Sequence, residues 1–316
     1  TGGTIAGRAA RQDDLSGYVA GQVSADDLVR GIPGLADTSL EVEQVAQVDS
    51  KDMDLAVWRT LVGRLMHHLD RPEVAGVVVT HGTDTLEETA YLLQALLRPS
   101  KPVVLTCAMR PATALAPDGP QNLSDAVQLA RWPGARGVVV LCAGKVHGAQ
   151  DVAKVHTFDI DAFDSGDAGP LGVFEHGQLR SFRPWPDGHS KEGVGGGSNH
   201  LSIAQRFLAL TELPRVEVVF SHAAADGAIV RCLLAEATSK SIPPLRGIVV
   251  ACTGNGSMHR TLESALELAH AKGVRVWRGT RCARGQVFTN APAFPDTGGL
   301  SPVKARLSMM LELIEA

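Results

Sequence analysis

No run of lysine or arginine occurs in the sequence, and its 34 acidic residues slightly outnumber its 30 basic ones, for a net charge of −4. Binding to nucleic-acid phosphates needs a concentrated basic face, so this balance excludes nucleic acid as the main partner. Long apolar runs are missing too. The longest, such as 76–80 and 137–142, are much shorter than the roughly 20 residues of a membrane-spanning helix, which excludes a helical membrane protein.

Patterns typical of disulfides or metal sites are also missing. None of the cysteines forms a C-x-x-C pair, and most lie in apolar runs, which predicts buried free thiols. Such thiols favour a reducing compartment, so we prefer a cytoplasmic location and leave a periplasmic one open. The chain opens at Thr1 without methionine, so the lack of a signal peptide is uninformative. The histidines show no H-E-x-x-H spacing, and we expect no metal and no cofactor. The five cysteines stand at positions 107, 142, 232, 252 and 282.

The 316 residues do contain a regular alternation of short valine-rich runs and amphipathic segments. The runs are continuous rather than alternating, as expected for strands covered by helices on both faces. Strand, helix and strand at this spacing predict βαβ units and a parallel sheet, so the predicted class is α/β. We expect strands at 76–80, 102–107, 137–143, 216–221, 247–252 and 274–277, and helices at 87–97, 123–130 and 262–271.

A break in this alternation predicts two domains, as the chain length also does. Residues 184–214 contain Pro184, Pro186 and a glycine-rich run at 193–198, a composition typical of a connector. We therefore expect a larger N-terminal doubly wound domain with a mostly parallel sheet over 1–183. The linker 184–214 then leads to a smaller C-terminal α/β domain with a parallel sheet over 215–316.

The first candidate site is the glycine-rich start, Thr1-Gly2-Gly3-Thr4-Ile5-Ala6-Gly7. Its glycines do not have the G-x-G-x-x-G spacing of a dinucleotide-binding turn. They do flank a hydroxyl, that of Thr4, and let the backbone approach a ligand closely. Backbone N–H groups in such a turn can stabilise an oxyanion, although a plain tight turn with an incidental threonine explains the pattern equally well.

The second candidate site, His81-Gly82-Thr83-Asp84-Thr85-Leu86-Glu87-Glu88, follows the strongest predicted strand. Ligands of open α/β sheets bind at this carboxyl edge. Thr85 and Glu88 have the spacing of a capping box, which predicts a structural role for Thr85. The side chains of Thr83 and Asp84 are then free to face a crevice. There a helix N-terminus favours a substrate carboxylate and Asp84 favours an ammonium. We expect His81 to pack or hydrogen-bond rather than to catalyse.

Lys154 is a candidate base because it follows the strand predicted at 137–143. A lysine held beside Thr83 and Asp84 can take part in proton transfer. Most lysines are solvated surface charges, so the sequence alone leaves both roles open.

Taken together, these segments resemble the bacterial-type L-asparaginase family, and within it the secreted, type II branch. The resemblance is carried by the two threonine motifs, 1–7 and 81–85, at this separation, and it covers essentially the whole chain. The further matches are Gly17-Tyr18, Asp49-Ser50-Lys51-Asp52-Met53, Ala108-Met109-Arg110-Pro111, Asp118-Gly119-Pro120, Gly254-Asn255-Gly256 and Leu300-Ser301-Pro302.

The resemblance implies a hydrolysis of free L-asparagine to L-aspartate and ammonia, with L-glutamine a poorer substrate. It implies that Thr4 is the nucleophile and forms an ester with the substrate, assisted by Tyr18 on a loop that closes over the site. Thr83, Asp84 and Lys154 form a second triad, in which Lys154 activates Thr83 or a water molecule. Threonine is a poor nucleophile at neutral pH, which is why such chemistry needs a base and an oxyanion hole.

The resemblance also implies the substrate-binding residues and the assembly, a homotetramer built from dimers with sites shared between subunits. Three positions depart from the family: Lys51 replaces a glutamine or glutamate, Ser257 replaces an asparagine, and Asp296 is the sole acid where secreted relatives supply one to a neighbour. The family also has a strand before the first threonine motif. The implied substrate-binding residues are Ser50, Lys51, Thr83, Asp84, Ala108, Asn255 and Ser257.

Three other functions remain open on the sequence. An ammonia-generating subunit of a tRNA amidotransferase shares the fold, but the acidic balance disfavours a tRNA-binding surface. An amino-acid-binding protein that has lost turnover would bind asparagine and release no ammonia. A nucleotide-dependent dehydrogenase is the weakest alternative, because the glycine spacing is wrong and no acidic ribose-binding residue stands about 20 residues beyond a fitting motif.

Overall fold

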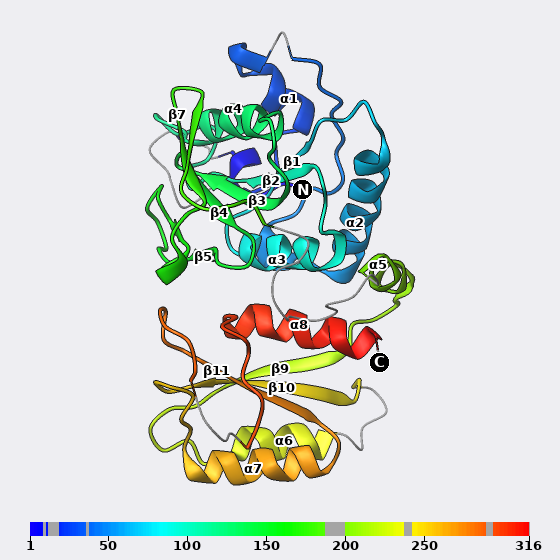
Figure 1. Cartoon of the computed structure of the whole chain (residues 1–316), viewed down its shortest axis with the longest axis vertical. Helices are drawn as coiled ribbons and strands as arrows, with labels where there is room; N and C mark the ends of the chain where they lie inside the picture. The colour runs from blue at the N-terminus through cyan, green and yellow to red at the C-terminus, as the bar shows by residue number, and fades with distance from the viewer. Residues whose placement is uncertain are drawn as a thin grey trace. The chain divides into compact units, whose positions relative to one another are not determined.

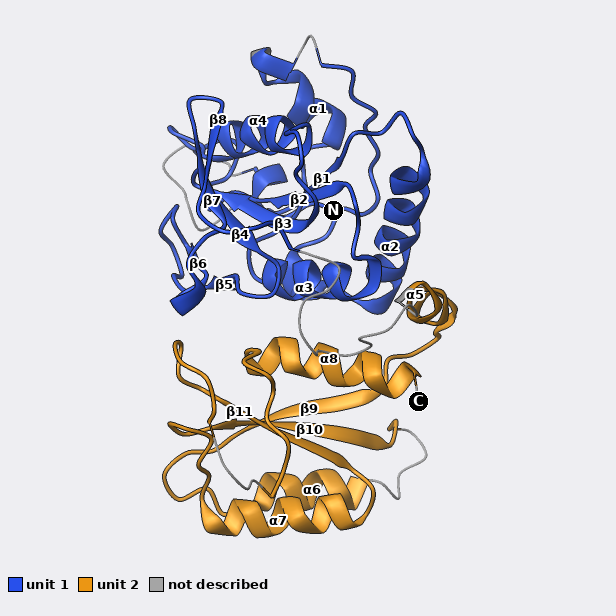
Figure 2. Ribbon diagram, in the orientation of Figure 1, with its two compact units in different colours: residues 1–190 blue, residues 191–316 orange. Residues whose placement is uncertain are grey.

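The computed structural model describes residues 1–8, 11, 19–35, 38–186, 200–236, 242–288 and 293–315. They form two compact units, unit 1 from Thr1 to Ser190 and unit 2 from Lys191 to Ala316 (Figure 2). Tyr18 lies outside the described residues, and so does the central part of the predicted linker. In the remainder of that linker the structure places a helix, α5 (His200–Ala209).

Unit 1 is built on a six-stranded sheet of order β1-β2-β3-β4-β7-β8. Its first half is parallel, with Val77 beside Val103 and Val103 beside Val138. Its second half is antiparallel, because short turns follow β3 and β7 in place of helical crossovers. The strands are β1 (Val77–Thr80), β2 (Pro102–Thr106), β3 (Gly137–Cys142), β4 (Lys145–Gly148), β7 (Gly172–Glu175) and β8 (Gln178–Ser181).

Helices cover both faces of this sheet: α4 lies on one face, and α2 and α3 lie on the other (Figure 1). The residues of β2 and β3 are therefore all buried, which explains their continuous valine runs. The helices of unit 1 are α1 (Ala25–Arg30), α2 (Leu55–Asp70), α3 (Leu86–Leu97) and α4 (Gly119–Ala130), with short 3₁₀ turns at Thr4–Ala6, Pro33–Leu35, Ser50–Asp52 and Gly166–Ala168. A separate two-stranded ribbon pairs β5 (Ala153–Lys154) with β6 (Phe163–Asp164).

Unit 2 has a parallel three-stranded sheet of order β11-β10-β9. Helix α8 packs on one face of it, and α6 and α7 lie on the other (Figure 1). Buried Ile248 and Val250 of β10 join Leu262 and Leu266 of α7 in its core. The elements are β9 (Arg215–Phe220), α6 (Ala228–Ala235), β10 (Leu245–Cys252), α7 (Arg260–Ala271), β11 (Arg275–Thr280) and α8 (Pro302–Glu315).

This architecture confirms the predicted α/β class, the larger sheet of unit 1 and the smaller parallel sheet of unit 2. The prediction that the sheet of unit 1 is mostly parallel is wrong, because β4, β7 and β8 join it by antiparallel pairing. Each predicted strand and helix exists, with ends displaced by a few residues. The prediction that the cysteines are buried holds for Cys107, Cys142 and Cys252 but is wrong for Cys232 and Cys282, which are exposed because they lie on the outer side of α6 and in the loop after β11. No helix among the described residues is long and apolar enough to cross a membrane.

Candidate active site

Two glycines bring the threonine motifs together in unit 1. Gly3 has φ +83°, and a Cβ atom on it would lie 2.2 Å from the Cα atom of Gly82. A Cβ atom on Gly82 would in turn lie 2.5 Å from the hydroxyl oxygen of Ser50. Only glycine permits such approaches. Thr4 and Thr83 each follow one of these touching glycines, so the two motifs predicted from the sequence meet at one place, and Ser50 meets them there.

Backbone contacts at the end of β1 hold the first motif in this position. The hydroxyl of Thr1 donates to the carbonyl of Thr80 at 2.8 Å, and the N–H of Gly3 donates to the carbonyl of Val48 at 3.0 Å. Thr4 then begins a 3₁₀ turn and is only 6% exposed. The candidate nucleophile is thus a buried hydroxyl at the carboxyl edge of the sheet.

Ser50 is fixed to the second motif by two hydrogen bonds. Its hydroxyl accepts from the N–H of Asp84 at 3.1 Å, and its carbonyl accepts from the hydroxyl of Thr85 at 2.7 Å. The capping box predicted for Thr85 and Glu88 is therefore wrong. Thr85 stands at the N-cap of α3 but makes no side-chain cap hydrogen bond, because its hydroxyl is directed to Ser50 instead. Its structural role is to position a predicted substrate-binding residue.

Lys154 lies where a base for Thr83 would have to be. Its Nζ donates to the hydroxyl of Thr83 at 2.8 Å and to the carboxylate of Asp84 at 2.6 Å. Thr83 is 5% exposed, whereas the side chains of Lys154 and Asp84 are 19% and 52% exposed. A hydroxyl within hydrogen-bond distance of an amine, itself held by a third group, is the arrangement that activated nucleophiles require.

Glu87 positions Lys154 and was not predicted from the sequence. The Lys154 backbone N–H donates to the Glu87 carboxylate at 2.5 Å. Lys154 lies on β5, which has two residues and pairs only with β6, so the ribbon has little intrinsic stability. Glu87 belongs to the first turn of α3, where an acidic residue is ordinarily explained by the helix dipole. Because the helix dipole already explains an acidic residue at this position, the sequence gives no signal of the contact between Glu87 and Lys154.

The helix that begins after the second motif also shapes the electrostatics. Thr83 and Asp84 immediately precede the N-terminus of α3, where partial positive charge and free N–H groups favour anions. Asp84 adds a negative charge beside that region. The same corner of unit 1 therefore offers separate places for a carboxylate and for an ammonium group.

The segment around Ala108 is held by a network of hydrogen bonds that was not predicted from the sequence. The amide of Asn122 donates to the carbonyl of Cys107 at 3.0 Å and accepts from the N–H of Ala143 at 3.0 Å. The carboxylate of Asp118 accepts the N–H groups of Met109 and Arg110, each at 2.9 Å. The four-residue spacing of Asp118 and Asn122 places both at the start of one helix, and that spacing is the signal that could have found them.

The ammonium group of Lys51 pairs with neighbouring carboxylates. Its Nζ lies 2.6 Å from a carboxylate oxygen of Asp49 and 3.2 Å from one of Asp52, and its side chain is 61% exposed. Hydrogen bonds to Asp49 and then to Asp52 raise the pKa of Lys51. The cation is thus neutralised by its own neighbours.

His81 is completely buried at the end of β1, as expected for a residue that packs. Its Nδ1 lies 2.7 Å from the carbonyl oxygen of Gly82. Burial lowers the pKa of His81 from 6.5 to about 4. A neutral imidazole therefore supports the glycine against which the first motif packs.

The predicted site residues of unit 2 lie in a loop that is bonded to its own unit. The side-chain amide of Asn255 donates to the carbonyl of Phe288 and accepts from its N–H, both at 2.6 Å. Ser257 is exposed and pairs through its backbone with Thr253. Asp296 accepts from the N–H of Gly298 at 2.7 Å.

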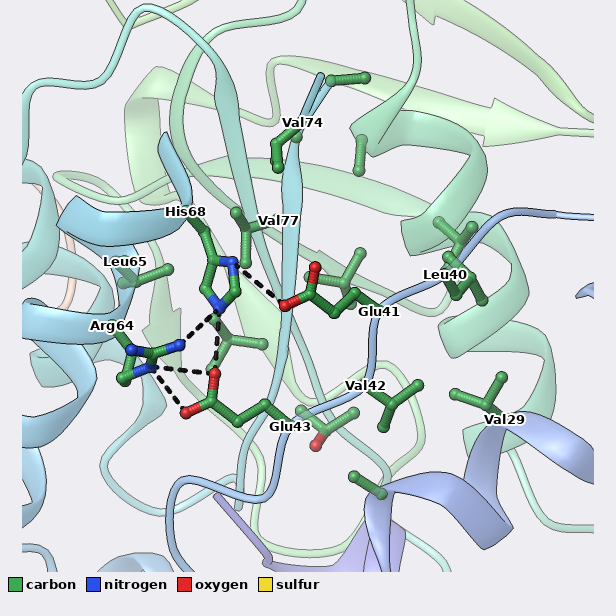
Figure 3. Close-up of a pocket in the computed structure, with 18 of the residues that line it drawn as sticks. Val29, Leu40, Glu41, Val42, Glu43, Arg64, Leu65, His68, Val74 and Val77 are labelled. Carbon is green, nitrogen blue, oxygen red and sulfur yellow. Dashed lines mark hydrogen bonds and ion pairs between the residues drawn. The ribbon is translucent and has the colours of Figure 1, made fainter. Parts of the chain in front are cut away.

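A cavity of about 390 Å³ lies elsewhere in unit 1, along β1 (Figure 3). Most of its lining residues are apolar, and several of its charged residues pair with one another: Glu43 lies 2.7 Å from Arg64 and 3.0 Å from His68. Hydrogen bonding to His68 and Arg64 lowers the pKa of Glu43. None of the predicted catalytic residues lines this cavity, so it is separate from the candidate site.

Two family models match the chain. The model described as "Asparaginase, N-terminal" matches residues 1–186, and the model described as "Glutaminase/Asparaginase C-terminal domain" matches residues 215–315. Together they cover nearly the whole sequence and both units.

Individual proteins match over the same length. The chain is 34% identical to L-asparaginase 2 of Escherichia coli, over 100% of this chain and 87% of that protein. It is 35% identical to the glutaminase-asparaginase of Acinetobacter glutaminasificans, over 99% and 93%. Among solved structures, the probable cytoplasmic L-asparaginase of Campylobacter jejuni superposes with a TM-score of 0.87 at 33% identity, covering 100% of this chain and 94% of that one.

Proposed function

The chain belongs to the asparaginase family, and we propose that it hydrolyses L-asparagine to L-aspartate and ammonia through an ester on Thr4, with weaker activity on L-glutamine. The observation that carries the proposal is the contact of the Lys154 ammonium with both Thr83 and Asp84, beside the point where Gly3 packs on Gly82. This contact joins a hydroxyl, an amine and a carboxylate at the carboxyl ends of the parallel strands of unit 1.

In the first half-reaction, the hydroxyl oxygen of Thr4 attacks the side-chain amide carbon of the substrate. The carbonyl oxygen takes the negative charge, and backbone N–H groups of the glycine-rich turn stabilise it. The C–N bond then breaks and ammonia leaves after gaining a proton, with Tyr18 assisting the proton transfer. Thr4 retains the aspartyl group as an ester.

In the second half-reaction, water replaces Thr4. Lys154, in its neutral form, takes a proton from the water, either directly or through the hydroxyl of Thr83, and the water oxygen attacks the ester carbon. The C–O bond to Thr4 breaks, the Thr4 oxygen regains a proton, and L-aspartate is released. The burial of Thr4 and Thr83 supports this scheme, because a site shielded from bulk water strengthens each electrostatic contact.

A free amino acid needs one group for its carboxylate and one for its ammonium. Ser50 and the N-terminus of α3 suit the carboxylate, and Asp84 suits the ammonium; their separation sets the position of the amide. We propose further contacts for Ala108, Asn255 and Ser257. For Lys51 we propose an indirect contribution, because Asp49 and Asp52 already hold its ammonium.

We also propose a homotetramer built from dimers, with sites shared between subunits, and a reducing, cytoplasmic location supported by the free thiols. Sedimentation of the active protein tests the assembly. A fully active species with the mass of one chain, 33.3 kDa, overturns the shared-site proposal.

The deciding experiment measures ammonia release from L-asparagine and L-glutamine by the chain and by Thr4→Ala, Thr4→Ser and Thr60→Ala. Thr60 is an exposed threonine on α2 and serves as the control. We expect release to vanish in Thr4→Ala, to persist in part in Thr4→Ser, and to be unchanged in Thr60→Ala. Release that is unaffected in Thr4→Ala moves the nucleophile to Thr83 or to water. Binding of asparagine without any release by the unmodified chain identifies an amino-acid-binding protein instead.

A further inference from the structure

Two cysteines lie side by side at the ends of neighbouring strands in unit 1. Cys142 is the last residue of β3, and Cys107 directly follows β2. The register pairs Thr106 with Leu141, so Cys107 and Cys142 are the next two residues of the same parallel ladder. Their sulfur atoms are 3.7 Å apart, and the residues are 0% and 2% exposed.

This arrangement is suited to a disulfide. Neighbouring strands lie about 4.8 Å apart, which falls within the Cα separations of roughly 4.4–6.8 Å that disulfides span. A sulfur–sulfur bond is about 2.05 Å long, so the two sulfur atoms need to approach by roughly 1.7 Å. The side chains already point toward each other, and rotation about their Cα–Cβ bonds can supply such a movement.

The hydrogen bond between the thiols gives the two cysteines different roles. The S–H of Cys107 donates to the sulfur of Cys142. The hydrogen bond to Cys142 and burial raise the pKa of Cys107 well above its usual value. Cys107 therefore keeps its proton and remains the donor in this contact. The S–H of Cys142 donates to the carbonyl of Ile160 at 3.8 Å. Cys142 is 2% exposed and Cys107 0%, so Cys142 is the slightly more accessible thiol.

The other three cysteines differ from this pair. Cys252 is buried in unit 2, where burial raises its pKa to about 11. Cys232 and Cys282 are exposed on unit 2. All five are free thiols, and hydrogen bonding between two sulfur atoms is found only for Cys107 and Cys142 within the described ranges.

We propose that Cys107 and Cys142 are a redox-active dithiol, a modification site at which a hydroperoxide closes an intramolecular disulfide. The sulfur of Cys142 attacks the terminal oxygen of the hydroperoxide, the O–O bond breaks, and the alcohol leaves with a proton, which produces a sulfenic acid. The sulfur of Cys107 then attacks that of Cys142, the S–O bond breaks, and water leaves with the Cys107 proton. Two thiols lose two electrons in total, and the hydroperoxide gains them.

The test uses the full chain carrying Cys232→Ser and Cys282→Ser, so that only buried thiols remain. The protein is treated with hydrogen peroxide, then quenched, denatured and alkylated, and its peptides are weighed by mass spectrometry. We expect Cys107 and Cys142 to become unavailable together, with their two peptides linked, and dithiothreitol to restore both. Cys252 is the internal control and stays available. The measurement does not depend on enzymatic turnover. A negative result therefore contradicts the redox proposal without bearing on the proposed enzymatic function.

Two results overturn the proposal. One is a protein in which all three buried thiols stay available after treatment that oxidises free cysteine. The other is oxidation of Cys107 or Cys142 singly, to a sulfinic or sulfonic acid, without linked peptides. As a second measurement, Cys107→Ser is expected to let the Cys142 sulfenic acid accumulate for trapping by dimedone. If this variant does not fold, the linked-peptide result on the protein with Cys107 intact still decides the matter.

Discussion

The carboxyl ends of the parallel strands carry similar polar residues in the two units, but those residues make different contacts. In unit 2, the loop after β10 holds threonine, asparagine and serine, and its polar groups bond to nearby backbone: Thr253 donates to the carbonyl of Ser257, and Asn255 pairs with both backbone groups of Phe288. In unit 1, Thr83, Asp84 and Lys154 bond to one another. The same topology supplies a ligand edge in both units, but the pairing of side chains determines which edge can perform chemistry.

The polar side chains of the two edges also differ in their exposure to solvent. Ser50, His81 and Thr83 of unit 1 are at most 5% exposed, whereas Asn255 and Ser257 of unit 2 are exposed. Burying a polar group is unfavourable unless it finds partners, so a buried polar cluster at a sheet edge is more informative than an exposed one. Charge and burial together support our proposal that the reaction takes place at the edge of unit 1.

Among changes that leave Thr4 in place, we expect removal of the lysine amine to be the most damaging to this edge. In Lys154→Met, Thr83 loses the proton acceptor that we propose for it, and Asp84 loses its ion pair. We expect kcat for ammonia release to fall about 10³-fold, within the range of positioned acid–base groups. Lys145→Met is the matched control, because Lys145 is a half-exposed lysine of the same unit that pairs with Asp161. Equal losses in both variants contradict the assignment of Lys154, as does a Lys154→Met protein with unchanged kcat.

The second prediction compares two histidines that follow the first strand of their unit. His81 directly follows β1 in unit 1, and His222 lies two residues after β9 in unit 2. Buried His81 has a pKa of about 4 against 6.5 when unperturbed. Between these values the unfolded state binds a proton that the folded state does not, so stability is complete above about pH 6.5 and is lost as the pH falls toward about 4. At about 1.4 kcal/mol per pKa unit, His81 accounts for about 3 kcal/mol of this loss.

Urea unfolding between pH 4 and pH 7 measures this effect in His81→Gln and His222→Gln. The unmodified chain is expected to weaken as the pH falls, and His81→Gln to weaken by about 3 kcal/mol less across the same interval. His222 is exposed, so His222→Gln should follow the unmodified chain. If the unfolding free energy of His81→Gln depends on pH as strongly as that of the unmodified chain, other groups cause the dependence.

The third prediction tests whether Glu87 positions the base. Glu87→Leu removes the acceptor for the backbone N–H of Lys154, so the amine is less often beside Thr83. We expect kcat to fall roughly tenfold with little change in KM, because the substrate contacts are untouched. Glu87→Gln keeps a carbonyl acceptor and should recover most of the loss. Glu175→Leu, an exposed acid on β7, is the control. A rise in KM with unchanged kcat, or no recovery by glutamine, contradicts the positioning role.

Much of this fold and part of this site could be predicted because the signals are local. Valine runs such as 137–142 reflect a strand covered on both faces, and the two threonine motifs contain the glycines that let them meet. Contacts across long separations had no such signal. Thr85 fits a capping box, yet its hydroxyl bonds to Ser50, 35 residues away, and Glu87 reaches Lys154, 67 residues away. Short antiparallel strands such as β4 and β7 have too few residues for a periodicity to be visible.

The smallest expected effect lies at the edge of unit 2. Asn255→Ala removes two exposed hydrogen bonds to Phe288, which together contribute about 1 kcal/mol to local stability. We expect the Phe288 amide to exchange with solvent about fivefold faster, as measured by hydrogen exchange. Ser257→Ala keeps these bonds and should leave that exchange unchanged, which makes it the matched control. If Asn255→Ala leaves the exchange unchanged and raises KM for asparagine instead, the amide is engaged with substrate rather than with Phe288. The edge of unit 2 then contributes to the reaction more directly than its bonding in the free chain indicates.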